Sequence, residues 1–490
     1  TVYKKATRWV LLIGVSLFPL FFLPWTTSVL ELNKQLLLAG VAGAGLVLWL
    51  LDVVISGKLS WRSNPLNKGV VVLAGAVALS SIFSMDGSKS VFGMAGSLSD
   101  SLLTVVALTV VYLLAVNSFD DKGQTLKAFF LVSLTVAILY GLFQMLGFHI
   151  LKYLDISILQ FAVSRAFNTL GSVNALGMTA AIALPALWLS ILPFRAGVIN
   201  YWLLKIGALA ALAVLVIINW WVLWVVAIAG MVSIVALESL NHGSLNIEHE
   251  TGLKLSRFLF PMTVMVLGIF LVVVNFNLVF VKNNLPVEIA LSYELSGNIA
   301  WKVLRENFAF GYGSENFSLA FDKYGAGELR NSDISGVKFF DSTSQVLNMV
   351  VHNGLVGLAA LGFILCLLGW SLFRKVINSE NIGVVSALIA AIVAMFFYPF
   401  NLVLVFMLYV LLALLALAVW GSQRVVYNVE EKASLSLVSS LGFIGGLILA
   451  LVGFYFMSLN YIADVKYAKA LGQTETQDAL NYTVEAINLK

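Results

Sequence analysis

Thirteen apolar stretches, separated by polar connections, constrain the fold of this chain more than any other feature. A transmembrane helix needs about 20 mostly apolar residues to cross about 30 Å of hydrocarbon, and each stretch meets or nearly meets that length. Backbone groups in hydrocarbon must be satisfied within their own segment, so we expect helices. The stretches are centred near Ser16, Gly45, Ala76, Thr109, Thr135, Leu184, Ala211, Ala229, Gly268, Gly357, Ala391, Leu411 and Leu447. The sequence predicts an all-α polytopic membrane protein with about 13 transmembrane helices.

The charge content agrees with this class. Charged residues make up 11% of the chain, against about 25% in an ordinary soluble domain. The net charge is only +4, and the basic residues are better explained as topology signals than as a nucleic-acid surface. We therefore expect membrane lipids and no nucleic acid as partners. The single cysteine, Cys366, excludes an intrachain disulfide.

Basic residues divide unevenly between the two sides of the membrane. If the N-terminus is cytoplasmic, the short inside segments hold sixteen lysines and arginines, whereas the short outside segments hold only Lys34 and Lys89. The inside residues are Lys4, Lys5, Arg8, Lys58, Arg62, Lys68, Lys122, Lys127, Arg195, Lys205, Lys254, Arg257, Arg374, Lys375, Arg424 and Lys432. The positive-inside rule favours this orientation. Thirteen spans then place the C-terminus and both long loops outside.

The chain divides into a polytopic membrane domain, residues 1–460, and an extracytoplasmic helical segment, residues 461–490. The membrane domain contains a smaller extracytoplasmic loop, residues 148–173, and a large one, residues 281–344, which we expect to carry an amphipathic helix. Pro19 and Pro24 should kink or end the first helix near its outer end, because proline lacks a backbone donor.

One helical face in the large loop carries four polar or aromatic residues. Their spacings of 4, 3 and 4 place them together on one side of a helix: they are Glu294, Asn298, Trp301 and Arg305. An acid, an amide, an indole and a guanidinium could hold a polar, anionic ligand. The alternative is an amphipathic helix lying on the membrane surface with this side in water.

The smaller loop contains one arginine, Arg165, followed by a glycine- and asparagine-rich turn that opens the sixth span. Asn174 is a candidate N-cap there. A helix N-terminus beside a guanidinium suits a phosphate or pyrophosphate. The alternative is an ordinary loop arginine near lipid headgroups.

Two other groups are assigned no chemistry. Trp220, Trp221 and Trp224 fit an aromatic belt at the outer interface. His242 and His249 lack the cysteine or carboxylate partners of a metal site, so no metal is expected.

Three segments together resemble the O-antigen ligase and O-antigen polymerase family. RAFNTLGSVNALG resembles that family's R-x-x-G-T-x-G-N-P-N segment, and NIAWKVLRENFAFGYGSENFSLAFDKY resembles its W-(x)n-P-x-x-G-x-G-x-x-x-F stretch. DSTSQVLNMVVHNGLVGLAALGFIL is similar to D-x-x-H-N-x-x-L-x-x-x-x-x-x-G-x-x-G-L, where the large loop re-enters the membrane. The order and spacing agree from about Arg165 to Gly369.

The resemblance implies a membrane glycosyltransferase of the GT-C kind in the bacterial plasma (inner) membrane. Such enzymes act in cell-envelope and lipopolysaccharide synthesis. They move a glycan from undecaprenyl pyrophosphate to a glycan, lipid or protein acceptor on the outer face, without a metal or other cofactor. Arg165, Arg305, Asn298 and Trp301 are then the candidate substrate-binding residues.

The chain departs from the family at the catalytic position. Ser344 stands where the family has histidine, or Thr343 in the other register, and neither can act unaided as a general base at neutral pH. His352 lies about 12 Å further along the helix axis and cannot simply replace that imidazole. The catalytic candidates are Asp341, Ser344 and Glu294, with Asp341 equally open to interpretation as the N-cap of the tenth span.

Residues 461–490 resemble the end of a tetratricopeptide repeat, which predicts a helical segment able to contact a protein partner. A single amphipathic helix on the outer surface is the alternative. For the whole chain, the rival functions are a lipid-linked glycan transporter or flippase, a non-catalytic glycolipid-binding homologue and a scaffold. Ionisable residues are scarce within the spans, which argues against ion-coupled transport.

Overall fold

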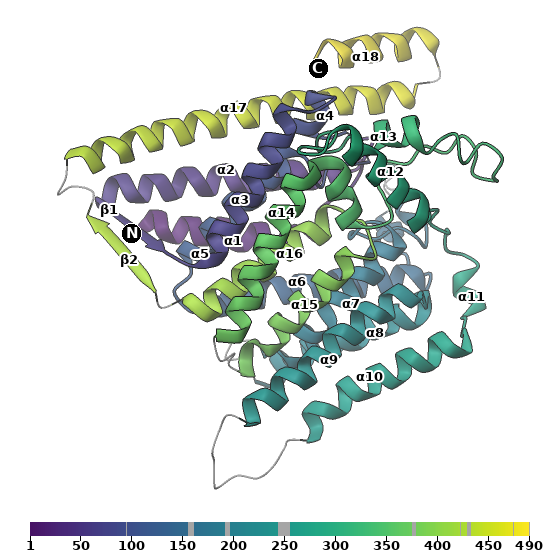
Figure 1. Cartoon of the computed structure of the whole chain (residues 1–490), viewed down its shortest axis with the longest axis horizontal. Coiled ribbons are helices and arrows are strands. Elements are labelled where there is room, and N and C mark those ends of the chain that lie inside the picture. The colour runs from purple at the N-terminus through teal and green to yellow at the C-terminus, as the bar shows by residue number, and fades with distance from the viewer. Residues whose placement is uncertain are drawn as a thin grey trace.

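The computed structural model describes residues 1–489 except 95, 155–160, 192–196, 244–254, 375–378, 422, 429–432 and 474. Thirteen long helices form the body of the described chain (Figure 1). They are α1 (Val2–Leu17), α2 (Glu31–Ser56), α3 (Pro65–Ile82), α5 (Leu102–Ser118), α6 (Gln124–Met145), α7 (Val173–Leu189), α8 (Gly197–Ile218), α9 (Trp221–Gly243), α10 (Leu255–Val274), α14 (Gln345–Arg374), α15 (Ile382–Met395), α16 (Leu402–Trp420) and α17 (Ala433–Leu471). The remaining elements are β1 (Lys58–Arg62), α4 (Gly87–Phe92), η1 (Ile150–Leu154), α11 (Val279–Lys282), α12 (Tyr293–Glu306), α13 (Phe317–Tyr324), η3 (Ser379–Asn381), β2 (Arg424–Asn428) and α18 (Thr476–Asn488).

Each predicted apolar stretch contains or overlaps one of the thirteen long helices. In the described part of the chain, seven of these helices are long and apolar enough to cross a membrane: α2, α3, α6, α9, α14, α16 and α17. Five more are apolar but contribute shorter segments: α5, α7, α8, α10 and α15. The chain is thus a mostly helical polytopic membrane protein, and the count of thirteen crossings stays a prediction.

Side chains that accept a hydrogen bond from the first helical turn mark several helix starts. The Asn64 side chain accepts a hydrogen bond from the Asn67 N–H, and Pro65 occupies the first turn of α3. Ser101, Ser292 and Asn401 cap α5, α12 and α16 in the same way. Helix α1 ends at Leu17, just before Pro19. This end is expected because proline has no backbone N–H to continue the helix.

One end of the bundle gathers basic residues from three separate segments around one acid. Strands β1 and β2 pair antiparallel there, with Lys58 opposite Asn428, beside the N-terminus in Figure 1. The carboxylate of Asp120 is bound by four basic side chains: Lys4 at 3.0 Å, Arg62 at 3.2 Å, Arg424 at 2.9 Å and Arg8. The sequence assigned no role to Asp120, yet it joins α1, both strands and the connection between α5 and α6. These contacts place four of the predicted inside segments at one common end.

The opposite end carries the large loop. Helix α12 buries Leu295, Ile299 and Val303 against α13 and the first turns of α14. These residues belong to a small apolar core of their own, separate from the core of the bundle. The predicted amphipathic helix is therefore confirmed, and its apolar side faces the protein.

Helix α14 is interrupted at Gly354, whose backbone has φ 57° and ψ −148°. The segment after α12 fills the interruption. The N–H groups of Leu355 and Val356 donate to the carbonyls of Phe308 and Ala309 at 3.0 and 3.1 Å. Because these backbone groups are satisfied by protein, the irregular backbone can lie within a membrane-spanning helix.

Residues 461–471 continue α17 without a break, and α18 follows as a separate helix packed against its end. The proposed boundary at residue 460 therefore falls inside one helix. Lys466 and Glu485 pair at 2.6 Å across the two helices, and Ala486 is buried between them. The two helices form a hairpin, and the resemblance to a tetratricopeptide repeat stays a prediction.

Candidate functional site

A cavity of about 760 Å³ lies at the end of the bundle that carries the large loop. Its walls come from the connections at the ends of α7, α8 and α15 and from the loop residues on either side of α12. Besides aliphatic residues, its lining includes the aromatic Trp220, Trp221, Tyr293 and Tyr398, the amides Asn174 and Asn219, the acids Glu288 and Asp341, and Lys338. This volume lies within the range of about 300–1,000 Å³ that is usual for ligand pockets.

Asp341, one of the predicted catalytic residues, lines this cavity. Its Oδ1 accepts a hydrogen bond of 2.9 Å from the side-chain amide of Asn348, on the first turn of α14. Burial raises the pKa of Asp341 to about 6. The charge of His352 acts to lower this pKa, and the charge of Asp100 acts to raise it. A carboxylate that takes up a proton near neutral pH suits general base chemistry.

Ser344, the residue at the family's histidine position, begins α14 instead of facing the cavity. Its Oγ accepts from the Leu347 N–H at 3.3 Å, and its side chain is 2% exposed. Thr343 is also occupied, because its hydroxyl donates to the Leu291 carbonyl at 2.7 Å. Ser344 is therefore the N-cap of α14, and the interpretation of Asp341 as that N-cap is wrong.

A second acid, Asp100, is held beside Asp341 by the same face of α14. The Gln345 amide donates to both Asp100 carboxylate oxygens, at 2.8 and 3.0 Å. About two turns beyond Gln345, His352 Nδ1 lies 3.1 Å from Asp100 Oδ2. His352 is fully buried, and its Nε2 has no hydrogen-bond partner among the described residues.

Glu315 completes this cluster from the large loop. It accepts the Asp100 N–H at 2.7 Å and the Ser97 hydroxyl, although it is itself buried. Its φ of +60° is strained for a residue other than glycine, and strain of this kind concentrates at functional sites. Burial, reinforced by the charge of Asp100, raises the pKa of Glu315 to about 8.

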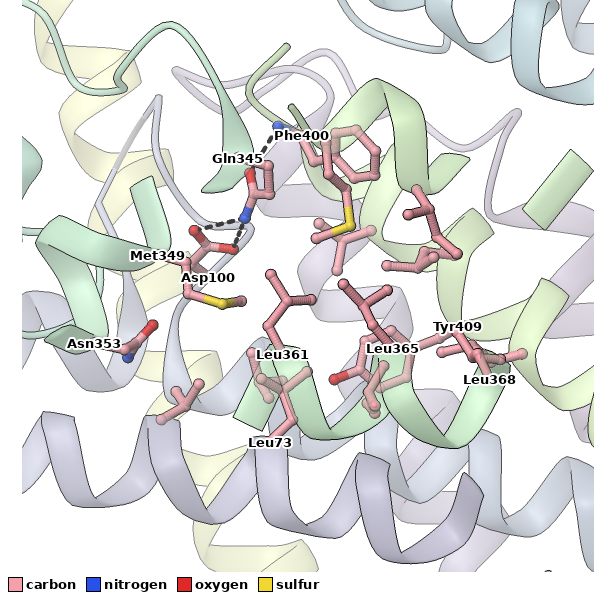
Figure 2. A pocket seen from close by; sticks show the side chains of 18 residues that line it. Leu73, Asp100, Gln345, Met349, Asn353, Leu361, Leu365, Leu368, Phe400 and Tyr409 are labelled. Carbon is pink, nitrogen blue, oxygen red and sulfur yellow. Dashed lines mark hydrogen bonds between the residues drawn. The ribbon is translucent and has the colours of Figure 1, made fainter. Parts of the chain in front are cut away.

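A narrow apolar crevice of about 60 Å³ leads away from Asp100 and Gln345 between α3, α14 and α16 (Figure 2). Leu73, Leu361, Leu365 and Tyr409 line its length. At its polar end the Gln345 amide lies between the Asp100 carboxylate and the Phe400 N–H, to which Gln345 Oε1 is bonded at 2.8 Å. The two carboxylates thus face different spaces: Asp341 faces the cavity and Asp100 faces the crevice.

The four residues predicted to share one face of α12 do share it, and that face is exposed: Glu294, Asn298, Trp301 and Arg305. Arg305 lies over the Trp301 ring, with its guanidinium carbon 5.1 Å from the ring centre. None of the four is among the described residues that line the cavity. The structure therefore brings Arg305 together with Trp301 but not with Asp341.

Arg165 lies beside the C-terminal end of α6. A methyl group added at Gly147 would come within 3.3 Å of its Nη2, and burial followed by the charge of Arg165 lowers the pKa of His149. The N-terminus of α7 is already occupied by an acid of the chain itself. Glu288 accepts the Asn174 N–H at 3.2 Å and the Asn174 side-chain amide at 2.9 Å.

Two sequence assignments change as a result. The N-cap of α7 is Ser172, whose hydroxyl accepts from the Ala175 N–H, and not Asn174. Trp224 is buried and donates to Asn219 Oδ1 at 2.8 Å, so it does not belong to a lipid-facing belt. Its neighbours Trp220 and Trp221 line the cavity instead.

The described residues contain no group of three or more histidine, cysteine or acidic side chains able to hold a metal ion. His249 lies outside the described residues. His242 lies in α9, which ends at Gly243.

Sequence reasoning missed Asp100 and Glu315 as members of the site. Asp100 lies in a glycine- and serine-rich loop, and Glu315 follows Gly311 and Gly313 in the stretch that resembles the family's glycine motif. The one available signal was their position, since both lie in polar connections on the same predicted side as Asp341. Position alone does not reveal a contact between loops more than 200 residues apart.

The fold and this cluster define a helical membrane protein with a buried acid–imidazole group between an open cavity and an apolar crevice. No known protein-family model matches the chain, and no curated protein is significantly similar to it. The resemblance drawn from the three sequence motifs therefore stays a prediction.

Proposed function

We propose that this protein transfers a glycan from undecaprenyl pyrophosphate to an acceptor at the outer face of the membrane, as an O-antigen ligase or polymerase does. The observation that carries the proposal is the placement of Asp341. It lines a cavity of ligand size, it is oriented by Asn348, and it lies next to the half-buried Asp100 and its buried partner His352.

In the proposed step, an acceptor hydroxyl oxygen forms a bond to the anomeric carbon of the donor glycan. The bond from that carbon to the pyrophosphate oxygen breaks, and undecaprenyl pyrophosphate leaves with the electron pair. The hydroxyl proton goes to the Asp341 carboxylate. A base of this kind contributes about 10²- to 10⁴-fold to the rate.

Arg165 and Arg305 remain the proposed contacts for the donor's pyrophosphate, because a guanidinium presents a planar fork of donors to phosphate oxygens. Neither is among the described residues of the cavity wall. Arg165→Lys and Arg305→Lys should lower transfer while leaving insertion unchanged. Lys302→Arg is the control on α12, since it keeps the charge at a neighbouring exposed site. If either arginine variant transfers glycan at the normal rate, that arginine does not bind the pyrophosphate and only contacts lipid headgroups.

The test of the function is carrier release. The purified chain is supplied with undecaprenyl-pyrophosphate-linked glycan and an acceptor glycan, and free undecaprenyl pyrophosphate is measured. Release that depends on the acceptor supports transfer. If no carrier is released by the folded wild-type chain with any acceptor class, the proposal fails.

The crevice favours a second candidate, a protein that binds or flips the lipid-linked glycan without transferring it. Its walls are apolar, and Asp100 and Gln345 give it one polar end. At about 60 Å³ it would have to widen to admit a lipid hydrocarbon chain. Liposomes separate the two functions. Movement of intact donor to the opposite leaflet, without carrier release, would favour the flippase.

A further inference from the structure

We infer that the cavity at Asp341 selects glycan segments that carry no negative charge and prefers those bearing amino groups. The inference rests on the proposed function and names the substrate class of the same site. It comes from the charges and rings that line the cavity.

Aromatic side chains give the cavity flat apolar surfaces. Trp220 packs edge-to-face against Tyr398 with ring centres 5.9 Å apart, and Trp221 packs in the same way against Phe397 at 5.9 Å. These contacts fix the rings in place, yet Trp221 remains 47% exposed. Fixed, accessible aromatic faces suit the C–H faces of sugar rings, since they offer contact area at little cost in conformational entropy.

The charges on the cavity wall are mostly negative. Glu288 and Asp341 line it, and Lys338 is the one basic residue among its described lining. The Lys338 ammonium is already paired with the Asp322 carboxylate at 2.8 Å. A uronate or other anionic sugar would therefore meet carboxylates without a free cation, whereas an amino sugar would meet complementary charge.

The polar groups beside these acids suit hydroxyl and amino donors. Glu288 is held by Asn174 and by the Tyr398 hydroxyl at 3.3 Å, so its position is fixed before a ligand binds. Fixed acceptors lose less conformational entropy on binding than mobile ones. The wall thus combines pre-positioned carboxylates with aromatic surfaces.

The test measures binding of three tetrasaccharides to the full chain in nanodiscs at neutral pH. The probes are the chitosan tetramer with four amino groups, the neutral chitin tetramer and tetragalacturonate. Affinity should fall in that order, with tetragalacturonate about tenfold weaker than the chitin tetramer. Trp221→Ala should weaken binding of the two favoured probes.

A matched pair of charge variants tests the cause. Val287→Lys adds a cation at an exposed position of the cavity wall, and it should strengthen tetragalacturonate binding and weaken chitosan binding. Gly327→Lys adds the same charge on the large loop outside the cavity wall, where a Cβ meets nothing within 4 Å, and it should change neither.

Equal or tighter binding of tetragalacturonate by the wild type, identical effects of the two lysine variants, or no binding of any probe at millimolar concentration would overturn the inference. The outcome is separable from carrier release. If the three tetrasaccharides bind in the expected order but no carrier is released, only the proposed glycan transfer is refuted. If carrier is released but anionic glycans bind more tightly, only the charge selection is refuted.

Discussion

The Nδ1 atom of His352 lies 3.1 Å from the Oδ2 atom of Asp100, although the two residues are 252 positions apart in the chain. Gln345, Asn348 and His352 are spaced by three and four residues, so they occupy one face of α14. That face orients two carboxylates at once: Asp100 through Gln345 and His352, and Asp341 through Asn348. The imidazole that the sequence left without a role is thus connected to the site through Asp100.

Asp341→Asn should abolish most transfer without unfolding the protein. The amide can still accept the hydrogen bond from Asn348, but it cannot take up a proton. We expect carrier release to fall by about 10²- to 10⁴-fold. Asp333→Asn, an exposed carboxylate of the same loop, is the control and should release carrier normally. Full activity of Asp341→Asn would show that Asp341 is not the general base.

The pH profile of the wild type gives an independent measurement. A base must be deprotonated to act, and the pKa of Asp341 is raised to about 6. Initial rates of carrier release at low substrate should therefore fall as pH drops through about 6 and level off above about 7. A rate that stays constant from pH 5 to pH 8 would contradict a base with this pKa.

Glu315 should make the fold less stable as pH rises. Its pKa is raised in the folded protein from 4.5 to about 8. A carboxyl with a raised folded-state pKa stabilises the fold at low pH, and this contribution is lost as pH climbs from about 4.5 to about 8. Glu315→Gln should unfold at a temperature that falls less between pH 5 and pH 8 than that of the wild type. Parallel curves for the two proteins would show that Glu315 is not a buried, protonated carboxyl.

Ser344→Ala should lower the free energy of unfolding and leave the rate of carrier release unchanged. The hydroxyl caps α14, and removing such a cap costs about 0.5–2 kcal/mol of unfolding free energy. Ser344→His should also destabilise the fold, because the side chain is 2% exposed and leaves no room for an imidazole. Unfolding in denaturant and carrier release are measured together. A stable but inactive Ser344→Ala would return this serine to the catalytic candidates.

The helical class and the polar face of α12 were predictable because both depend on local periodicity. An apolar stretch of about 20 residues specifies a helix in hydrocarbon whatever its neighbours are. Likewise, the spacing of Glu294, Asn298 and Trp301 alone determines that they share a side. Asp341 could be singled out because it directly precedes a predicted span.

The rest of the site depends on contacts between distant segments. Nothing near Asp100 or Glu315 in sequence indicates that their loops meet, and the partner of His352 is 252 residues away. The predicted N-cap of α7 was wrong for a related reason. Asn174 has a suitable side chain, but Ser172 lies where the helix begins, and the Asn174 amide donates to Glu288 instead.

Labelling of single cysteines should fix the orientation. In a Cys366→Ala background, Lys58→Cys places a thiol on β1 at the basic end, and Asp333→Cys places one on the large loop; both positions are exposed. By the positive-inside rule, a membrane-impermeant maleimide should modify only Asp333→Cys in intact spheroplasts. Both should react after the membrane is permeabilised. Modification of Lys58→Cys in intact spheroplasts would reverse the orientation.

Gly311→Ala should disrupt the junction between the large loop and α14. Gly311 has φ +66°, and an added Cβ would lie 2.5 Å from the Val351 carbonyl oxygen and 2.8 Å from the Gly354 nitrogen. These atoms are backbone and cannot rotate away, so the loop must shift from the break in α14. Since His352 lies between those two contacts, the variant should lower both the unfolding temperature and carrier release. Gly327→Ala, which meets nothing within 4 Å, should match the wild type in both measurements. A Gly311→Ala protein as stable and active as Gly327→Ala would show that α14 does not depend on this close backbone contact.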